Sequence, residues 1–447
     1  MKQIRLMAFD MNCVGHIQQG LWRHPRDRSA EYTSLEHWTG LARLLERGLF
    51  DGLFLADVLG VYDVHGGSPA AAIEHAVQVP VGDPLLLVPA MAAATRDLGF
   101  GVTVNLSYET PFAFARRMST LDHLTRGRIG WNVVTGYLDS AARAMGQDRQ
   151  RAHDDRYDVA DDFMQAVYGL WEGSWAEGAM LRDRASGRFA DPARVRAITH
   201  DGPYHKMEAV HLCEPSPQRT PVLFQAGSSG RGRAFAGAHA ECVFLNGQGQ
   251  AAVRAHVDAI RDAAVAAGRA RTDVLTFVGA TVIVAETAAL AEAKLADYRR
   301  YASPEAALVH ASASMGIDLD RLGMDEPIGG ESNAIVSNVQ AMAKEGMTKR
   351  KLLDRMVLGS RQPPIVGDPV QVADALAGWI EGADVDGFIL SRTVTPECFE
   401  DFVNLVVPEL QRRGLYKESY AAGTLREKLF GGGRLLPPGH PAAAARV

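Results

Sequence analysis

Short apolar runs alternate with amphipathic stretches along most of the chain. The runs are rich in β-branched and aromatic residues, which is typical of buried strands, and they occupy positions 4–9, 52–56, 98–105, 127–134, 221–226, 241–245, 274–284 and 387–391. The stretches between them place apolar residues at spacings of three and four, which predicts helices. Eight strands that are each followed by a helix predict a parallel α/β architecture.

The length of the chain and the two breaks in this alternation favour one α/β class over another. A chain of 447 residues suits a (β/α)8 TIM barrel that forms a single domain over 1–447, with insertions after strand four, at about 138–218, and after strand seven, at about 303–366. A doubly wound sheet is the alternative. However, the sequence has no GxGxxG motif to open a dinucleotide-binding helix.

Polar residues follow several of the predicted strands at their carboxyl ends. Asp57 comes after the second strand, Asn105 ends the third, and Tyr137 follows the fourth strand, GRIGWNVV. The carboxyl ends of barrel strands converge on one mouth, so we expect these side chains to meet there. Read alone, each strand could equally be an ordinary buried strand, and the agreement among several strand ends favours a site.

The turn after the fifth strand, AGSSGRG at 226–232, has the composition of an anion cradle. Its glycines allow close approach, Ser228 and Ser229 offer hydroxyls, and the following helix offers free N–H groups. His153 and Tyr157 share one face of a predicted helix and could hold a phosphate or a ring. A flexible turn and a solvated helix start are the alternatives. Barrel phosphate sites usually follow strands seven and eight instead.

Other polar candidates are more ambiguous. Cys13 and His16, after the first strand, could form a thiolate–imidazole pair, but such a cysteine is more often a small buried hydrophobe. His16 alone could act as a general acid or orient a substrate. His310 lies in a run of small residues and could close over the mouth, or it could be an ordinary loop histidine. The sequence shows no metal motif and no paired carboxylates, which leaves an apolar mouth with one anion cradle and favours a phosphorylated cofactor and an apolar substrate.

The overall composition excludes several classes of partner and compartment. A net charge of −6 argues against nucleic acid or an anionic membrane as the main partner. The sequence has no apolar run near the roughly 18 residues that span a bilayer, and its N-terminus lacks a signal-peptide pattern. The four cysteines form no CxxC pair. These features predict a cytoplasmic protein without a metal site.

Several long motifs together resemble one known superfamily. The segments MNCVGHIQQGLWRHP, LFLADVLGVYDV, ARRMSTLDHLTRGRIGWNVVT, HDDRYDVADDFM and CEPSPQRTPVLFQAGSSGRG are similar to those of the bacterial luciferase-like flavin monooxygenases. Within that superfamily the chain resembles the nitrilotriacetate and dibenzothiophene-sulfone monooxygenase branch, and most closely its dimethyl-sulfide and long-chain alkane monooxygenases. The resemblance covers nearly the whole chain.

This resemblance implies a two-component monooxygenase. Reduced FMN would come from a separate NAD(P)H:flavin oxidoreductase and react with O2 to a C4a-hydroperoxide, which transfers one oxygen atom to a small apolar substrate. The matching positions put Asp57, Asn105 and Tyr137 at the flavin ring, and His153, Tyr157, Ser228 and Ser229 at its phosphate. They put Cys13, His16, Tyr62, Gln78 and His310 on the substrate side, where His16 would hydrogen-bond the reacting oxygen with help from Tyr62 and His310. Family habit suggests a homodimer or homotetramer.

One departure within the branch bears on the substrate. The alkane enzymes have histidine where this chain has Tyr137 and serine where it has Gly136, whereas tyrosine matches the dimethyl-sulfide enzyme. We therefore expect an organosulfur substrate, with a terminal alkane hydroxylase as the alternative. A flavin-binding relative without catalysis and an enzyme that uses a deazaflavin are the remaining hypotheses.

Overall fold

Eight parallel strands form a closed barrel, as the sequence predicts. The computed structural model describes residues 2–227, 229–245, 249–329, 332–335, 339, 342–343, 346–356, 358 and 362–447. The order around the barrel is β1-β14-β11-β10-β9-β4-β3-β2. The strands are β1 (Arg5–Met11), β2 (Gly52–Ala56), β3 (Gly99–Asn105), β4 (Ile129–Val134), β9 (Val222–Gln225), β10 (Cys242–Leu245), β11 (Leu275–Ala280) and β14 (Gly387–Ser391).

Amphipathic helices surround the barrel and bury their apolar stripes against its outer face. In the first of them, Trp38, Leu41 and Leu45 lie three and four residues apart and are buried, as the spacing predicts. The helices of this layer are α1 (Leu35–Arg47), α3 (Val88–Ala94), α4 (Pro111–Leu124), α6 (His153–Tyr168), α7 (Gly230–His239), α8 (Gly249–Ala266), α13 (Pro369–Ala383), α14 (Glu397–Asp401) and α15 (Val407–Arg412).

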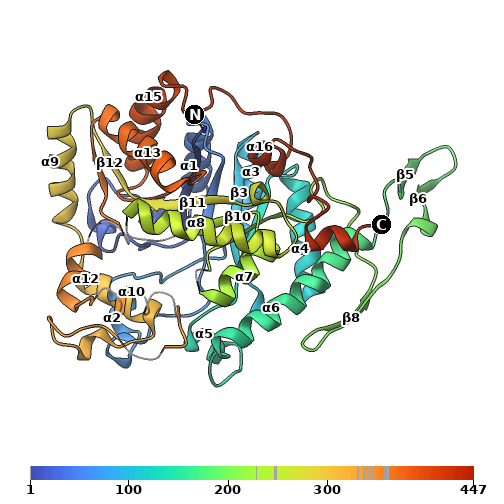
Figure 1. Ribbon diagram of the computed structural model, residues 1–447, viewed down its shortest axis with the longest axis horizontal. Coiled ribbons are helices and arrows are strands. Elements are labelled where there is room, and N and C mark those ends of the chain that lie inside the picture. Colours follow the sequence, from blue (N-terminus) through green and yellow to red (C-terminus); the bar gives the residue numbers. More distant parts are fainter. Residues whose placement is uncertain are drawn as a thin grey trace.

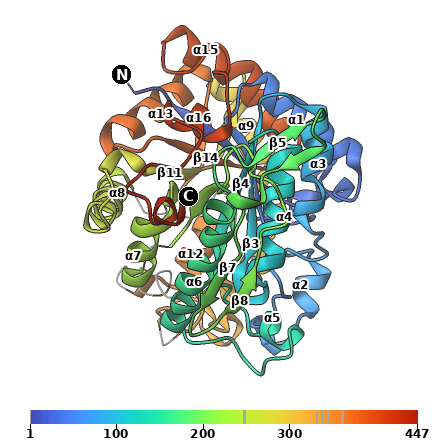
Figure 2. The same cartoon turned by 90° about the vertical axis from the view of Figure 1, so that its right-hand side faces the viewer.

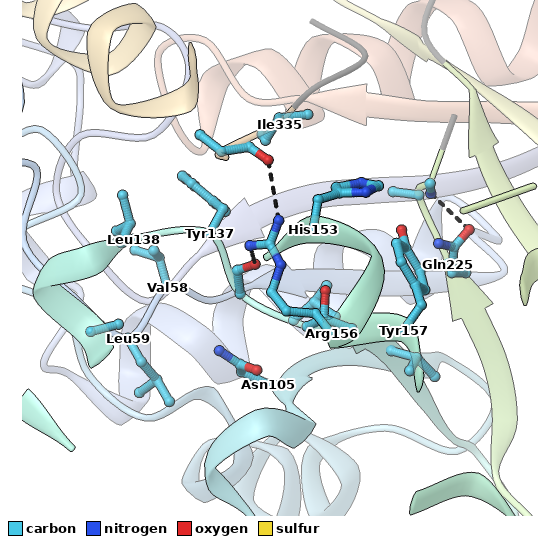
Figure 3. Close-up of a pocket in the computed structure, with 18 of the residues that line it drawn as sticks. Val58, Leu59, Asn105, Tyr137, Leu138, His153, Arg156, Tyr157, Gln225 and Ile335 are labelled. Carbon is cyan, nitrogen blue, oxygen red and sulfur yellow. Dashed lines mark hydrogen bonds between the residues drawn. The ribbon is translucent and has the colours of Figure 1, made fainter. Parts of the chain in front are cut away.

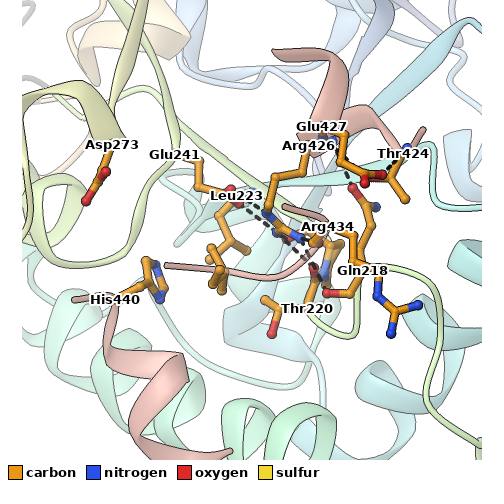
Figure 4. Close-up of polar contacts among 12 residues, drawn as sticks. Gln218, Thr220, Leu223, Glu241, Asp273, Thr424, Arg426, Glu427, Arg434 and His440 are labelled. Carbon is orange, nitrogen blue, oxygen red and sulfur yellow. Dashed lines mark hydrogen bonds and ion pairs between the residues drawn. The ribbon is translucent and has the colours of Figure 1, made fainter. Parts of the chain in front are cut away.

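The amino-terminal end of the barrel is closed by the short helix α16 (Leu425–Phe430), at the top of Figure 1. Leu425 and Leu429 join the cluster of aromatic and aliphatic side chains that fills the barrel interior. Between them, Arg426 reaches Glu241 through two contacts, 2.6 Å from Nε to Oε1 and 2.9 Å from Nη2 to Oε2 (Figure 4). Both side chains are buried, so this ion pair fixes the carboxyl-terminal segment against the amino-terminal end of the barrel.

The segment after β4 contains both a barrel helix and an extension. After α5 (Asp139–Ala144), α6 packs between α4 and α7 (Figure 2) and so takes the position of a barrel helix. Two antiparallel hairpins follow, β5 (Met180–Asp183) with β6 (Arg188–Ala190), and β7 (Ile198–Asp201) with β8 (Lys206–Ala209). They project from the body of the molecule at the right of Figure 1.

The segment after β11 differs from the expected single strand at 274–284. The chain leaves the barrel at Thr281, and β12 (Val282–Val284) pairs in parallel with β13 (Ile365–Gly367) in a separate sheet. A continuous apolar run cannot distinguish one buried strand from two in succession, so the prediction was wrong here. The excursion also holds α9 (Ala288–Arg299), α10 (Pro304–Met315) and α12 (Lys349–Met356). Helix α10 packs against α2 (Ala70–Glu74), from the loop after β2, at the lower end in Figure 1.

Within the described ranges, no helix combines the length and the apolar composition needed to cross a bilayer.

Candidate functional site

A pocket lies at the carboxyl ends of β2, β3, β4 and β9, between α6 and α7 (Figure 3). It brings together six of the seven side chains predicted to hold the cofactor, and the seventh, Ser228, lies outside the described residues. The polar side chains that line the pocket are Asp57, Asn105, Thr135, Tyr137, His153, Arg156, Tyr157, Gln225 and Ser229. Strand ends that are far apart in the sequence therefore meet at one mouth, as the barrel predicts.

One end of the pocket is built around the start of α7. Ser229 is the N-cap of that helix, and its Oγ accepts a hydrogen bond from the Gly232 N–H at 3.0 Å. His153 Nε2 lies 3.4 Å from the same Oγ. The Arg231 guanidinium lies 5.5 Å from the centre of the Tyr157 ring. The amino terminus of a helix and a hydroxyl favour an anion at this end.

Two glycines of the AGSSGRG turn leave room for Tyr157. A Cβ added to Gly227 would lie 2.2 Å from Gln225 Nε2 and 2.9 Å from the Tyr157 hydroxyl oxygen, and one added to Gly232 would lie 2.8 Å from that oxygen. Neither position therefore tolerates a side chain without displacing the tyrosine. The glycine content of the turn reflects this close approach.

The other end of the pocket carries an amide and a carboxyl group. Asn105 Oδ1 accepts the Ser107 N–H at 3.0 Å, and a Cβ added to Gly136, whose φ is +72°, would lie 2.4 Å from Asn105 Nδ2. Burial, reinforced by the nearby Asp83 carboxylate, raises the pKa of Asp57 to about 7. Asp57 therefore exists in both protonation states near neutral pH, and its protonated form can donate a hydrogen bond.

A chain of hydrogen bonds connects this pocket to the predicted substrate side. The Tyr62 hydroxyl donates to Gln78 Oε1, and the hydroxyl oxygens of Tyr62 and Tyr137 lie 2.7 Å apart. Because the Tyr62 hydroxyl donates its proton to Gln78, the Tyr137 hydroxyl must donate to Tyr62. The Tyr137 oxygen can then still accept a hydrogen bond from a group in the pocket. Tyr62 and Gln78 are buried. Tyr137 thus belongs both to the pocket lining and to the cluster behind it.

The remaining predicted substrate-side residues lie around this chain rather than in the pocket lining. The His310 ring, on α10, lies 5.8 Å from the Tyr62 ring, and the Gln78 N–H donates to the Gly15 carbonyl at 3.0 Å, which brings the loop of Cys13 and His16 alongside. His16 is buried with its ring edge-on to Phe9 at 4.6 Å. Burial, together with the charges of Arg392 and His310, holds the pKa of His16 well below its usual value of 6.5, so its imidazole is neutral.

Cys13 does not have the properties of a nucleophile. Its Sγ donates to the Gly15 carbonyl oxygen at 3.3 Å, and burial raises the pKa of the thiol to about 12. Because the thiolate is the reactive form, this thiol is inert at neutral pH. The thiolate–imidazole interpretation of Cys13 and His16 is therefore disfavoured, and Cys13 fits the alternative of a small buried side chain.

Two polar residues of the pocket, Arg156 and Gln225, were not predicted from the sequence. Arg156 is buried, donates to the Gly136 carbonyl, and reaches the Asn333 carbonyl at 2.9 Å, so it ties the loop after β4 to the second insertion. Gln225 ends β9, and its Oε1 accepts the Gly227 N–H at 2.7 Å. The strand-end argument that located Asn105 applies equally to Gln225. Arg156 carried no comparable signal because it stands in the charged run HDDRYD.

The described side chains include no group of three or more His, Cys, Asp or Glu residues arranged to hold a metal ion.

Comparisons with known proteins point to one family. The family model of the luciferase-like monooxygenases matches residues 11–386. The dimethyl-sulfide monooxygenase of Hyphomicrobium sulfonivorans is 46% identical and covers 100% of this chain and 94% of its own. The long-chain alkane monooxygenase of Geobacillus thermodenitrificans is 48% identical and covers 100% and 98%. A solved structure of riboflavin lyase with modified FMN and its substrate riboflavin is 40% identical, covers both chains completely and superposes with a TM-score of 0.95. The resemblance of the motifs is thereby confirmed, and the chain belongs to the family of luciferase-like, flavin-dependent monooxygenases.

Proposed function

We propose that this protein is a two-component monooxygenase that uses reduced FMN and O2 to oxygenate a small organosulfur compound. The observation that carries the proposal is the hydrogen bond between Tyr137 and Tyr62. It joins the pocket, one end of which suits an anion, to the buried residues that the resemblance places around a substrate. The named activities of relatives at 46% and 48% identity support the same reaction class.

The chemistry of the pocket fits FMN. The start of α7, with Ser229, His153 and Tyr157, suits the ribityl phosphate. Asp57, Asn105 and Tyr137 at the other end suit the polar edge of the isoalloxazine ring, where they offer both donors and acceptors. The glycines at 227 and 232 let the Tyr157 hydroxyl approach the turn closely. Reduced FMN, when bound, supplies the activation of O2.

The protein would then contribute by orienting the substrate and by excluding water from it. Tyr62, Gln78 and His16 are buried, so a substrate beside them would be shielded from bulk water, which protects reactive oxygen species from unproductive loss. Neutral His16 offers one N–H donor and one acceptor, which suits hydrogen bonding to a reacting oxygen atom. The Tyr137–Tyr62–Gln78 chain holds the hydroxyls in fixed directions. No covalent step by Cys13 is needed.

The substrate class follows from the apolar surroundings and from Tyr137. The side chains packed around Tyr62 are apolar and mostly small, namely Ala72, Val77, Leu138, Ala141, Ala306, Val309 and Ala313. An uncharged molecule with few polar atoms suits apolar surroundings of this kind. The tyrosine at position 137 favours a dialkyl sulfide over a long-chain alkane. Terminal alkane hydroxylation remains the second candidate because the named alkane enzyme is 48% identical over 446 residues.

The proposal includes a separate partner. A GxGxxG motif is absent from the sequence, so a second nucleotide site for NAD(P)H has no support in the chain. We propose that an NAD(P)H:flavin oxidoreductase supplies the reduced FMN by diffusion or transient contact.

A reconstituted assay tests the proposal. The protein, FMN, NADH and a generic flavin reductase are sealed with dimethyl sulfide, and headspace chromatography follows the sulfide. We expect consumption that requires the protein, FMN, reductase and O2. Tyr137→His serves as a matched variant, which should lower activity on the sulfide more than on an alkane. NADH oxidation that yields only hydrogen peroxide, with sulfides, sulfones and alkanes all untouched, would overturn the proposal; loss of the flavin itself would favour a flavin-degrading activity instead.

A further inference from the structure

A buried ion pair stands next to the loop that carries Cys13 and His16. Asp10 lies near the end of β1, and Arg392 is the first residue after β14. Arg392 Nε is 3.0 Å from Asp10 Oδ1, with side-chain exposures of only 4% and 0%. Strands β1 and β14 are neighbours in the barrel, so the pair sits at the seam where the barrel closes. Ion pairs this deep are expensive to desolvate, which makes a purely stabilising role a weak explanation.

The same guanidinium also holds the loop itself. Arg392 Nη2 donates to the Cys13 carbonyl at 3.0 Å and to the Val14 carbonyl at 2.7 Å. One planar group therefore connects the β1 carboxylate to two consecutive carbonyls of the loop. A lysine ammonium could reach one of these partners but lacks the fork that contacts all of them.

The loop that Arg392 holds, residues 12–16, is in contact with the segment that carries Gln78. The Gly15 carbonyl accepts the Gln78 N–H, and a Cβ added to Gly15 would lie 2.2 Å from the Ala76 carbonyl oxygen. Loop 12–16 is thus packed directly on the segment that ends in Gln78. A shift of one would displace the other, and with it the partner of Tyr62.

We propose that Arg392 is a positioning residue of the substrate side: it fixes loop 12–16, and so sets the places of His16 and of the Tyr62–Gln78 pair. This inference rests on the proposed function for its catalytic consequence, but its structural content can be tested without a substrate. Arg392 is not among the residues that line the pocket, so we expect FMN binding not to depend on it.

Electrostatics around the loop agree with this role. The groups whose charges act on His16 are Arg392 and His310, and both oppose its protonation in addition to burial. The groups whose charges act on Arg392 are Asp10, Cys13, Asp27 and Cys398. Burial raises the pKa of Asp10 to about 6, although Arg392 opposes this shift. The charges that act on His16 are thus both positive, and loss of the Arg392 guanidinium should make protonation of its imidazole easier.

Three variants of the full chain separate positioning from general stability. Arg392→Met removes the charge and the fork, and Arg392→Lys restores only the charge. Arg128→Met is the matched control, because Arg128 is also a buried arginine that donates to backbone carbonyls, those of Leu98 and Ala92, but at the start of β4 and at the opposite end of the barrel. Each variant is measured for melting temperature, FMN affinity, product per reduced FMN, and the NMR titration of His16 in protein labelled with 13C-histidine, with the resonance assigned by its loss in His16→Asn.

We expect Arg392→Met to bind FMN within about twofold of the parent, since it leaves the pocket intact, yet to lose on the order of 10- to 100-fold in product per reduced FMN, as misplacement of reacting groups by an ångström does. The His16 resonance should titrate at higher pH. Arg392→Lys should recover the low His16 pKa and only part of the yield, whereas Arg128→Met should lower the melting temperature alone.

If Arg392→Met fails to fold, Asp10→Asn/Arg392→Met removes both charges and carries the same test. An unchanged His16 titration and resonance position in a folded Arg392 variant would overturn the inference, whatever the substrate. If the His16 changes appear but no substrate is turned over by the parent, the positioning role stands and the proposed function fails.

Discussion

Ser229 is predicted to have two roles that one substitution can separate. Its Oγ accepts the Gly232 N–H at 3.0 Å as the N-cap of α7, and its side chain lines the pocket, where the hydroxyl can turn to donate to a ligand. A serine hydroxyl can accept one hydrogen bond and donate another at once. Ser229→Ala removes both interactions, so we expect it to weaken the helix start and the binding of the FMN phosphate together.

The expected magnitudes differ for the two roles. Loss of an N-cap costs about 1 kcal/mol of folding stability. Loss of a hydrogen bond to a charged group costs about 1.5–3 kcal/mol. Because Ser229 is only half-buried, we expect its binding effect around or below the lower limit of that range, at about 1–2 kcal/mol. Since 1.4 kcal/mol corresponds to a tenfold change in affinity, the dissociation constant for FMN should rise about 5- to 30-fold.

The assay compares two ligands in two variants. FMN and riboflavin are titrated by fluorescence quenching; riboflavin lacks the phosphate, so its affinity for Ser229→Ala should match that of the parent. Ser34→Ala is the control for the cap, because Ser34 caps α1 with its side chain in the same way and lies outside the pocket lining. It should lose similar stability and keep its FMN affinity. An unchanged FMN affinity in Ser229→Ala, or an equal loss for riboflavin, would refute the assignment of Ser229 to the phosphate.

Three further predictions follow from the buried polar groups. The pKa of Asp57 is raised to about 7, so between about pH 4 and pH 7 the folded protein holds a proton that the unfolded chain has released. Folding stability is therefore lost as the pH rises through that window and stays lost above it. The melting temperature of Asp57→Asn, compared with that of the parent, should be higher at pH 8 than at pH 5, and a difference that does not vary with pH would contradict this. Arg426→Met should cost about 3–5 kcal/mol in chemical denaturation, because it leaves Glu241 buried and unpaired, whereas a double variant that also replaces Glu241 by leucine should recover much of the loss. Tyr137→Phe should lower product per reduced FMN by about fivefold, the equivalent of one neutral hydrogen bond, and Tyr62→Phe should lower it further because it leaves two partners unbonded; equal yields in the parent and both variants would remove the chain from the mechanism.

The barrel could be predicted because its strands carry the signal in their own residues. Runs such as 52–56 and 387–391 are apolar throughout, which a strand buried on both faces requires, and their positions agree with β2 and β14. The run at 274–284 is apolar for the same reason, yet it serves two sheets, and only the pairing of β12 with the distant β13 shows this. Pairing over some 80 residues leaves no local trace in the sequence.

The cofactor pocket could be predicted in part, because strand ends in a barrel converge. This rule located Asp57, Asn105 and Tyr137, and it would have located Gln225. It cannot find Arg156, which enters from α6. Arg392 does follow the end of β14, but the rule cannot give its contacts, because its partner Asp10 lies 382 positions earlier and its other partners are backbone carbonyls. The roles of His16, His310 and the other substrate-side residues, the oligomeric state and the cytoplasmic location stay predictions.

A single-turnover experiment tests the central claim most directly. The protein is loaded with reduced FMN without oxygen, mixed with oxygenated buffer with or without dimethyl sulfide, and assayed for remaining sulfide and for hydrogen peroxide. The account predicts that sulfide disappears in proportion to the FMN oxidised and that hydrogen peroxide falls correspondingly when sulfide is present. If every equivalent of reduced FMN yields hydrogen peroxide, with sulfide and with alkane alike, the pocket binds flavin without directing its oxygen chemistry, and the account is contradicted.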